Sequence, residues 1–391
     1  MQTLIELYDD HPLENVLGVE MFRPERVVYI CPEKVEKNKT IQRRMQSYFE
    51  HRGLPVKIKF IRARIYDAGA MLQTLRAVVS RWPDCAVDIT GGTDAVLYAA
   101  GMLGAEKPIP AFTFSQKNSC FYDIRNAPFA AGLPCRVRFS VEDCILLAGG
   151  SIQQGRMDNT ILAEYFPVID PFFQIYLKHR RQWVRIVTFI QRLSQTNPEG
   201  PIPLTVQGAY TVKGERSDRI DAPEDALRDL AALGFLKELS LDHEAGVRFT
   251  FRDHQVRFWL RDVGSVLELF VYKACVDTRL FDDVRLSAIV DWEANEQQSA
   301  VTNELDVLAT RGIAPVFISC KTCEVRTEAL NELAILRDRF GGKTAKAAVV
   351  TAERGGGAMR SRAAELGIRV IDLDDLAGGS LGKQIRRLLE K

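Results

Sequence analysis

Carboxylates and a lysine with spacing suited to phosphodiester chemistry occur near the C-terminus. Glu304 and Asp306 lie two residues apart in a predicted strand, 302–308, so both side chains point to one face. The apolar run of the next predicted strand, 315–322, ends in Lys321. Carboxylates can hold a hard cation that acidifies water and neutralises charge on a phosphate, and a lysine can orient or deprotonate the attacking water. The pattern predicts metal-dependent phosphodiester cleavage; the alternative is a solvated hairpin with charged ends.

Length and composition set the broad class. The chain has 391 residues, enough for two or three domains, and 46% hydrophobic and 26% charged residues, as in ordinary globular proteins. A net charge of +1 excludes a globally basic nucleic-acid binder, so such contact requires a local patch. Eight scattered cysteines indicate reduced thiols, and Cys320-x-x-Cys323 lacks the second pair typical of a zinc site. Without a signal or membrane-spanning segment, we expect a cytoplasmic protein that does not bind a membrane.

Strand and helix patterns alternate from residue 1 to about 128. This alternation predicts an α/β fold, a parallel sheet with helices on both faces. Ligands bind beyond the carboxyl ends of such strands, which here carry Asp9-Asp10-His11-Pro12 and Thr90-Gly91-Gly92-Thr93. Two glycines allow close backbone approach, and the following helix N-terminus attracts an anion. The second turn therefore predicts contact with a phosphate or nucleotide; a tight turn with a threonine N-cap is the alternative.

The N-terminal strand with its polar turn, together with Asp88-Ile89-Thr90-Gly91-Gly92-Thr93, resembles the CARF domains of CRISPR accessory effectors. These are Rossmann-like sensors of cyclic oligoadenylate, and the resemblance covers about residues 1–145. It implies a homodimer in which a two-fold-symmetric ring lies across two copies of the glycine turn. The ligand-binding residues that it implies are Asp10, His11, Pro12 and Asn15 in a first loop, Thr90, Gly91, Gly92, Thr93 and Asp94 in a second, and Gln116, Lys117 and Asn118 at the rim.

Residues 146–254 are predicted to connect two domains. Gly149-Gly150-Ser151 predicts a joint, and a basic amphipathic helix is expected over 172–193. A helix beginning near Pro223 and two following strands resemble a winged-helix module. Its helix carries Asp225, Arg228 and Asp229 rather than a basic set, which favours a connecting and dimerising role over DNA reading.

The final segment, 255–391, begins with a predicted long helix from Gln255 that places Glu268 within an apolar stripe. A carboxylate in such a stripe needs a partner or a function, because burying a bare charge is costly. The order helix, three strands, helix, strand resembles the PD-(D/E)xK restriction-endonuclease core. Gly264-x-x-x-Glu268 resembles the variant found in Holliday-junction and methylation-dependent restriction nucleases.

The second resemblance implies a catalytic set and a metal site. Glu268, Asp306 and the Cys320 carbonyl would hold Mn²⁺ or Mg²⁺, and Lys321 would be catalytic. Ser319 stands where the family has its second acidic residue, and Glu304 would replace that residue or support the metal ligands. This departure leaves open a weak or manganese-preferring metal site, or an inactive one.

A CARF-like N-terminus before a restriction-endonuclease-like C-terminus resembles the single-CARF CRISPR ancillary nucleases that cyclic tetra-adenylate activates. The resemblance implies a dimeric nuclease, gated by its ligand, that cuts single-stranded RNA or DNA or nicks duplex DNA. Candidates for a local basic groove are Lys273, Lys321, Arg326, Arg354, Arg360 and Arg362. Two alternatives stay open: a nucleotide-sensing transcription regulator with an inert C-terminal domain, and a sensor that also cleaves its ring ligand using Thr93 or Lys117.

Overall fold

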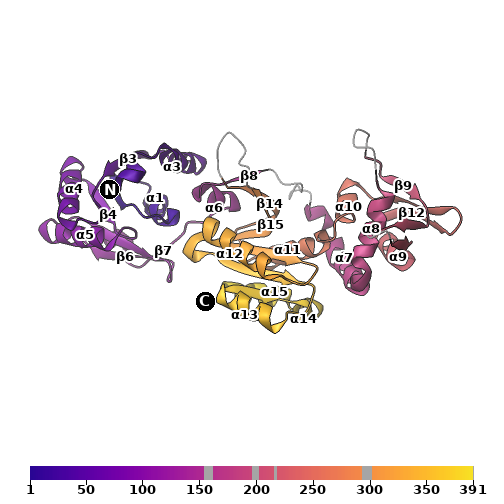
Figure 1. Ribbon diagram of the computed structural model, residues 1–391. Coiled ribbons are helices and arrows are strands. Elements are labelled where there is room, and N and C mark those ends of the chain that lie inside the picture. The colour runs from indigo at the N-terminus through magenta and orange to yellow at the C-terminus, as the bar shows by residue number, and fades with distance from the viewer. Residues whose placement is uncertain (154–161, 196–201, 215–217, 293–301, 391) are drawn as a thin grey trace.

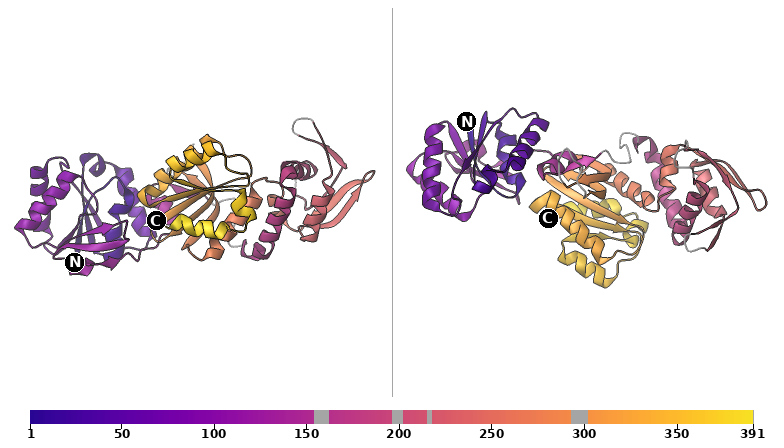
Figure 2. Two further views of the ribbon diagram at one scale, coloured as in Figure 1. Left: turned by 90° about the horizontal axis from the view of Figure 1, so that it is seen from below. Right: turned by 45° about the horizontal axis from the view of Figure 1, so that its top comes forward.

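A computed structural model describes residues 1–153, 162–195, 202–214, 218–292 and 302–390. Three units lie in a row along an elongated molecule (Figures 1 and 2). The N-terminal unit contains β1–β7 with α1–α5, and the central unit contains α6, β8 and the elements from α11 onward. The distal unit contains the elements from η3 to α10. No helix in the described segments combines the length and apolar character needed to cross a bilayer.

The N-terminal unit is built on a seven-stranded sheet of order β3-β2-β1-β4-β5-β6-β7. The pairs among β1–β5 are parallel, and β6 and β7 add antiparallel edges. Helices cover both faces, with α1 and α3 on one and α4 and α5 on the other, which confirms the predicted parallel α/β sheet. The strands are β1 (Thr3–Leu7), β2 (Arg26–Cys31), β3 (Lys57–Arg62), β4 (Cys85–Asp88), β5 (Ala111–Ser115), β6 (Cys120–Arg125) and β7 (Leu133–Pro134). The helices are η1 (Pro12–Asn15), α1 (Leu17–Phe22), α2 (Glu33–Glu36), α3 (Lys39–His51), α4 (Ala68–Arg81), α5 (Asp94–Glu106) and η2 (Pro128–Ala130).

Two carboxyl groups are buried together in this sheet. Glu6 on β1 and Asp88 on β4 are register partners, and both are almost fully buried. Glu6 Oε1 and Asp88 Oδ2 have no hydrogen-bond partner among the described residues. A Cβ atom on Gly18 would lie 2.7 Å from Asp88 Oδ2 and 2.8 Å from Glu6 Oε1, so only glycine fits against the pair. Burial raises the pKa of Asp88 to about 7, and burial with the neighbouring Asp88 charge raises the pKa of Glu6.

This carboxyl pair predicts a pH-dependent stability. Between about pH 4 and pH 7 the unfolded chain ionises both groups while the folded chain keeps protons on them, so the free energy of unfolding falls as pH rises. The Glu6→Gln variant, whose amide can donate to Asp88, should gain about 1–3 kcal/mol at about pH 8 and little at about pH 4.5. Urea unfolding at both pH values measures this. Glu25→Gln, at an exposed position, is the control, and an equal gain at both pH values would contradict the prediction.

The central unit contains a six-stranded sheet of order β18-β17-β16-β15-β14-β8. The pairs from β8 to β16 are antiparallel, and β16, β17 and β18 run parallel. Helices α11 and α15 cover one face, while α6, α12 and α13 cover the other. The strands are β8 (Ser151–Gln153), β14 (Asp283–Asp291), β15 (Thr302–Arg311), β16 (Ala314–Lys321), β17 (Lys346–Thr351) and β18 (Ile368–Ile371). The helices are α6 (Val141–Leu147), α11 (Ser265–Thr278), α12 (Thr327–Gly341), η5 (Gly342–Thr344), α13 (Gly357–Glu365), α14 (Leu373–Ala377) and α15 (Leu381–Leu389).

The predicted order of elements in this unit is confirmed, but the predicted single helix from Gln255 is wrong. The chain forms α10 (His254–Trp259), breaks, and then forms α11. The break occurs because the Asp262 carboxylate accepts hydrogen bonds from the Ser265 backbone N–H at 2.7 Å and hydroxyl at 2.8 Å, which starts a new helix.

The distal unit combines helices with small antiparallel sheets. The predicted continuous helix over 172–193 is also wrong, because a 3₁₀ turn, η4 (Arg180–Gln182), separates α7 (Phe166–His179) from α8 (Trp183–Leu193). The turn lets Trp183 fold back onto Phe172 and Tyr176. The remaining elements are η3 (Leu162–Tyr165), β9 (Thr205–Gly208), β10 (Thr211–Lys213), β11 (Arg219–Asp221), α9 (Glu224–Ala232), β12 (Leu236–Asp242) and β13 (Gly246–Phe251).

The predicted helix and two-stranded wing correspond to α9, β12 and β13, and β9 adds a third strand. Asp229 of α9 forms an ion pair with Lys178 of α7 and a hydrogen bond with the His179 ring at 2.6 Å, and the predicted connecting and dimerising role stays a prediction. The predicted domain boundaries stay predictions. One strand from the predicted connector, β8, pairs with β14 of the central sheet.

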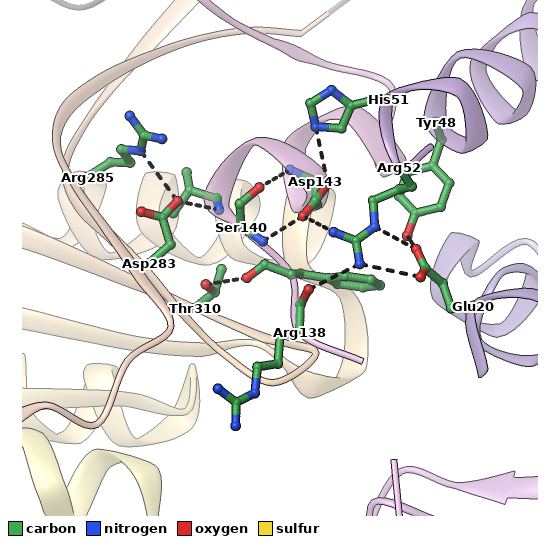
Figure 3. Close-up of polar contacts among 12 residues, drawn as sticks. Glu20, Tyr48, His51, Arg52, Arg138, Ser140, Asp143, Asp283, Arg285 and Thr310 are labelled. Atoms are coloured by element: carbon green, nitrogen blue, oxygen red, sulfur yellow. Dashed lines mark hydrogen bonds and ion pairs between the residues drawn. The ribbon is translucent and has the colours of Figure 1, made fainter. Parts of the chain in front are cut away.

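A network of charged side chains joins the N-terminal and central units (Figure 3). Arg52 at the end of α3 donates to Glu20 at 2.7 Å and to Asp143 of α6 at 2.9 Å. The Ser140 side chain and Asp143 form a capping box that starts α6, and the Val141 N–H donates to Asp283 of β14 at 3.0 Å. Helix α6 is thus attached to the N-terminal unit on one side and to the central sheet on the other.

Candidate functional site

The predicted active-site residues of β15 and β16 meet where these two strands separate. The pairing of β15 with β16 ends at Val307 and Ile318, so Asp306 and Ser319 are not paired with each other's strand. The Asp306 carboxylate fills the gap: its Oδ2 accepts from the Cys320 backbone N–H at 2.6 Å and from the Ser319 hydroxyl at 3.1 Å. The fork therefore fixes the orientation of the Asp306 carboxylate.

Lys321 lies beside this carboxylate. Its Nζ is 3.5 Å from Asp306 Oδ2, and its side chain is 37% exposed, so the ammonium group is open to a ligand. Burial lowers the pKa of Lys321, but the charges of Asp306, Cys320 and Glu268, together with the hydrogen bond to Asp306, outweigh burial and hold the pKa above its ordinary value. Lys321 is therefore a cation at neutral pH, which suits contact with a phosphate better than removal of a proton from water.

Glu268 approaches the fork from α11, which packs on β14, β15 and β16. Gly264 makes room for it, since a Cβ atom there would lie 2.7 Å from Glu268 Oε1. Burial raises the pKa of Glu268 to about 8, with further contributions from the charges of Asp306, Asp262 and Glu304. No hydrogen bond or ion pair to a described residue satisfies the Glu268 carboxyl.

Glu304 lies two residues before Asp306 on β15, near the exposed end of the fork. The hydroxyl of Ser287 donates to Glu304 Oε1. Ser287 has a φ of 53° and lies between the pairs Leu286–Val307 and Ala288–Leu305, across which the register of β14 and β15 is unbroken. The hydrogen bond from Ser287 holds the Glu304 carboxylate, and the role of Glu304 as a replacement acid stays a prediction.

The donor chemistry fits a hard divalent cation. Glu268, Asp306 and Glu304 crowd negative charge around a single lysine, and carboxylate oxygens are the ligands that Mg²⁺ and Mn²⁺ favour. The ligand atoms of these three residues do not all lie within 4.8 Å of one another. Among the described residues, Asp9, His11 and Glu14 have ligand atoms that all lie within 4.8 Å of one another. The hydrogen bond between Asp9 and His11 and the ion pair between Glu14 and Lys343 already account for this cluster.

Most cations predicted to form a basic groove are paired with acids. Lys273 contacts Asp170 and Asp277, and Arg354 and Arg360 contact Asp374 and Asp372. Arg362 contacts Glu365 and Asn331. Paired cations attract a phosphate backbone weakly. Lys321 is also paired, with Asp306 at 3.5 Å, so Arg326, which is exposed, is the predicted groove cation that this argument favours.

In the N-terminal unit, the first predicted loop is held by Asp9 and Asn15. The Asp9 carboxylate accepts from the His11 N–H at 2.9 Å and its ring Nδ1 at 2.8 Å, and from the Gly92 N–H at 3.3 Å. Asn15 is buried, and its amide bonds to the backbone of Asp9 and His11. Asn15 thus shapes the loop, while Asp10, His11 and Pro12 reach its surface.

The second predicted loop lies against the first. A Cβ atom on Gly91 would lie 2.7 Å from the Leu7 carbonyl oxygen, and Gly92 has a φ of 99°, so both positions require glycine. The Thr90 hydroxyl donates to Asp88 and accepts from the Phe114 N–H, and the Thr93 hydroxyl donates to the Ile65 carbonyl at 2.6 Å. These bonds leave the backbone and Asp94, at the start of α5, to face a ligand.

The predicted rim residues follow β5. Gln116 donates to Glu14 at 3.0 Å, and Asn118 donates to the Tyr122 hydroxyl at 3.0 Å. Lys117 also has an interaction partner. The structure therefore brings Gln116 to the first loop, whereas Asn118 lies farther out on the hairpin.

At both sites the structure adds residues to which sequence reasoning assigned no role: Asp9 and Asp88, which stand inside the quoted motifs, and Glu14, Asp262 and Lys343, which no motif contained. Asp88 was visible as an acid inside an apolar strand, the same signal that singled out Glu268. Lys343 had no signal, because its contact with Glu14 joins positions 329 residues apart.

A family model matches the C-terminal part of the chain. Residues 253–388, which hold Glu268, Asp306 and Lys321, match the family described as "Card1-like, endonuclease domain". Over this segment the chain is similar to Card1-like endonuclease domains. No curated protein matches the chain.

Two solved structures share the fold over almost the whole chain. Protein VC1899 from Vibrio cholerae superposes with a TM-score of 0.75 at 18% identity, covering 98% of this chain and 97% of that one. Can2 from Sulfobacillus thermosulfidooxidans, in complex with cyclic tetra-adenylate, superposes with a TM-score of 0.71 at 17% identity, covering 99% and 98%. The predicted fold class, a Rossmann-like N-terminal α/β domain followed by a connector and a C-terminal α/β domain, is therefore confirmed.

Proposed function

We propose that this protein is a metal-dependent endonuclease of CRISPR antiviral defence that cyclic tetra-adenylate, here called the messenger, activates. The observation that carries the proposal is the fork between β15 and β16, which gathers Asp306 and Lys321 under Glu268 inside a Card1-like domain. The glycine turn of the N-terminal unit supplies a second, separate site suited to an anionic ligand.

Each active-site residue has a distinct role in this proposal. Glu268, Asp306 and the Cys320 carbonyl would hold Mg²⁺ or Mn²⁺, which supplies an acidified water and neutralises charge on the phosphate. Lys321 binds a phosphate oxygen of the substrate and, through Asp306, stays aligned at the fork. Ser319 and the Cys320 N–H fix the carboxylate of Asp306, and Glu304 would replace the acid that the family has at position 319 or would support the metal ligands.

Messenger binding would act through a dimer. Two glycine turns related by a two-fold axis match the symmetry of a cyclic tetranucleotide, so the ring would bring two N-terminal units and two Card1-like domains together. The substrate would be single-stranded RNA, single-stranded DNA or one strand of a duplex.

The direct test is a cleavage assay on the full chain. The protein is incubated with Mn²⁺ or Mg²⁺ and labelled single-stranded RNA, labelled single-stranded DNA or supercoiled plasmid, with and without cyclic tetra-adenylate. Cleavage that requires both metal and messenger supports the proposal and identifies the substrate. Messenger binding without cleavage of any substrate would instead favour a regulator with an inert nuclease domain.

Ser319→Asp tests the departure from the restriction-endonuclease pattern. An aspartate would add a carboxylate next to Asp306 and Glu268, so we expect the metal concentration for half-maximal cleavage to fall about tenfold, the size of effect that groups supporting a metal typically have. Metal titration of the messenger-activated enzyme measures this. Ser319→Ala, which removes the 3.1 Å bond to Asp306 without adding charge, should shift the same titration in the opposite direction. An unchanged metal requirement in Ser319→Asp would place Ser319 outside the metal site.

A further inference from the structure

A cavity of about 270 Å³ lies between the N-terminal and central units, beside the first messenger loop. Residues 10–13, helix α3 and the segment 338–344, which ends α12 and forms η5, line it. Small-molecule pockets usually measure about 300–1,000 Å³, so this cavity suits one nucleotide unit of a larger ligand. Both units therefore contribute to a single cavity next to the proposed messenger site.

Three cations and two acids, Asp10 and Asp338, line this cavity. Arg44 enters from α3, and Arg339 and Lys343 come from the Card1-like domain, where Arg339 also donates to the Ala148 carbonyl at 2.6 Å. Arg44 is half-buried yet has no hydrogen bond or ion pair with a described residue, and Gly149 leaves the space that its guanidinium occupies. Burial lowers the pKa of Arg44, and the nearby charge of Arg339 lowers it further. A cation buried without an anion is costly, and a phosphate is the group that guanidinium donors match best.

Lys343 connects this cavity to the messenger loop. Its Nζ lies 3.4 Å from Glu14 Oε1, and Gln116 donates to the same oxygen at 3.0 Å. Glu14 is buried and belongs to η1, whereas the Lys343 side chain is 55% exposed. Lys343 can therefore turn toward an incoming anion while Glu14 still accepts the hydrogen bond from the Gln116 amide. Apolar walls from Leu147 and Phe340 offer a surface for a base.

We infer that Arg44, Arg339 and Lys343 form a phosphate subsite for one nucleotide of the messenger, shared between the sensor and the nuclease domain. The bound phosphate would hold the two units together and so link occupancy of the messenger site to the position of the Card1-like domain. The inference rests on the proposed function for the identity of the ligand. A nucleotide phosphate is the required chemistry, and either the messenger ring or a free nucleotide could supply it.

Calorimetric titration of the full chain with cyclic tetra-adenylate and, separately, with AMP tests the subsite. We expect Arg44→Gln and Lys343→Glu to weaken messenger binding about tenfold or more, because each removes a charge-assisted hydrogen bond. Arg43→Gln on the same helix and Lys346→Glu at the start of β17 are exposed positions outside the cavity and should bind within about twofold of the wild type. Melting temperatures of all four variants verify that they fold.

The possible outcomes separate this inference from the proposed function. If the wild type binds the messenger and Arg44→Gln and Lys343→Glu bind it equally well, the subsite is disproved and the proposed function stands. If the wild type binds AMP through Arg44 but does not bind the messenger, the subsite is supported and the messenger proposal fails. If it binds neither ligand, both fail.

Discussion

Replacing Lys321 with alanine should abolish messenger-dependent cleavage. The ammonium group is the exposed cation of the fork, 3.5 Å from the carboxylate of Asp306, and removing it deletes the contact proposed for the substrate phosphate. Loss of one such charge-stabilising donor in an active site costs about 10²–10³ in rate. Initial rates at saturating messenger and metal measure the effect, on whichever substrate the wild type cuts.

Two controls separate chemistry from folding and from sensing. Lys346→Ala removes an exposed lysine at the start of the neighbouring strand and should leave the rate unchanged. Lys321→Ala should bind the messenger as the wild type does, since its position lies in the other unit. Cleavage by Lys321→Ala at the wild-type rate would mean that the fork is not the active site. Lys321→Arg keeps the charge, so partial recovery of the rate is expected.

The distal unit supports the helix that carries Glu268. Phe173 of α7 stacks on Phe270 of α11 with ring centroids 3.8 Å apart, and Lys273 of α11 pairs with Asp170 of α7. A single hydrophobic core runs from the distal unit across α11 to β15 and β16. Such packing restricts movement of α11 relative to the fork, so the distal unit helps to fix the position of Glu268.

Sequence alone predicts those parts of the structure that depend on local patterns of apolar and polar residues. Short apolar, β-branched runs locate most strands of the two sheets, because helices cover both faces and strands such as β1, β2, β4 and β17 bury nearly every side chain. The acids and the lysine of the fork were recognisable because each interrupts or ends an apolar run. A charge in such a run is costly to bury unless it is paired or binds a ligand.

The part that sequence could not supply depends on contacts between distant segments. A polar cap at Asp262 divides one apolar stripe into two helices, and the pattern of apolar residues does not record such a cap. Arg52 and Asp143 meet across 91 positions, and nothing local distinguishes them from solvated charges. The shared cavity has the same origin, since Arg44 and Lys343 belong to patterns that are ordinary for surface helices.

Replacing Gly91 with alanine should impair messenger binding more than any other single-methyl change in the N-terminal unit. The added Cβ atom would lie 2.7 Å from the Leu7 carbonyl oxygen and 2.9 Å from the Asp9 Cβ atom. Neither of these is the end of a flexible side chain, so the two loops must move apart. Overpacking of this kind costs about 1–3 kcal/mol, which corresponds to a loss of roughly five- to 150-fold in affinity if the messenger must restore the original spacing.

The matched control is Gly101→Ala on α5. A Cβ atom there meets nothing within 4 Å, so messenger affinity should stay unchanged and the helix should become slightly more stable. Calorimetric titration of both variants with cyclic tetra-adenylate gives the comparison, and thermal unfolding shows how much of the Gly91→Ala effect is loss of folded protein. Because the active site lies in another unit, Gly91→Ala should regain cleavage when the messenger concentration is raised by the same factor as its affinity falls. If Gly91→Ala bound the messenger with wild-type affinity, the glycine turn would not be part of the messenger site. The proposed position of the ring would then be wrong.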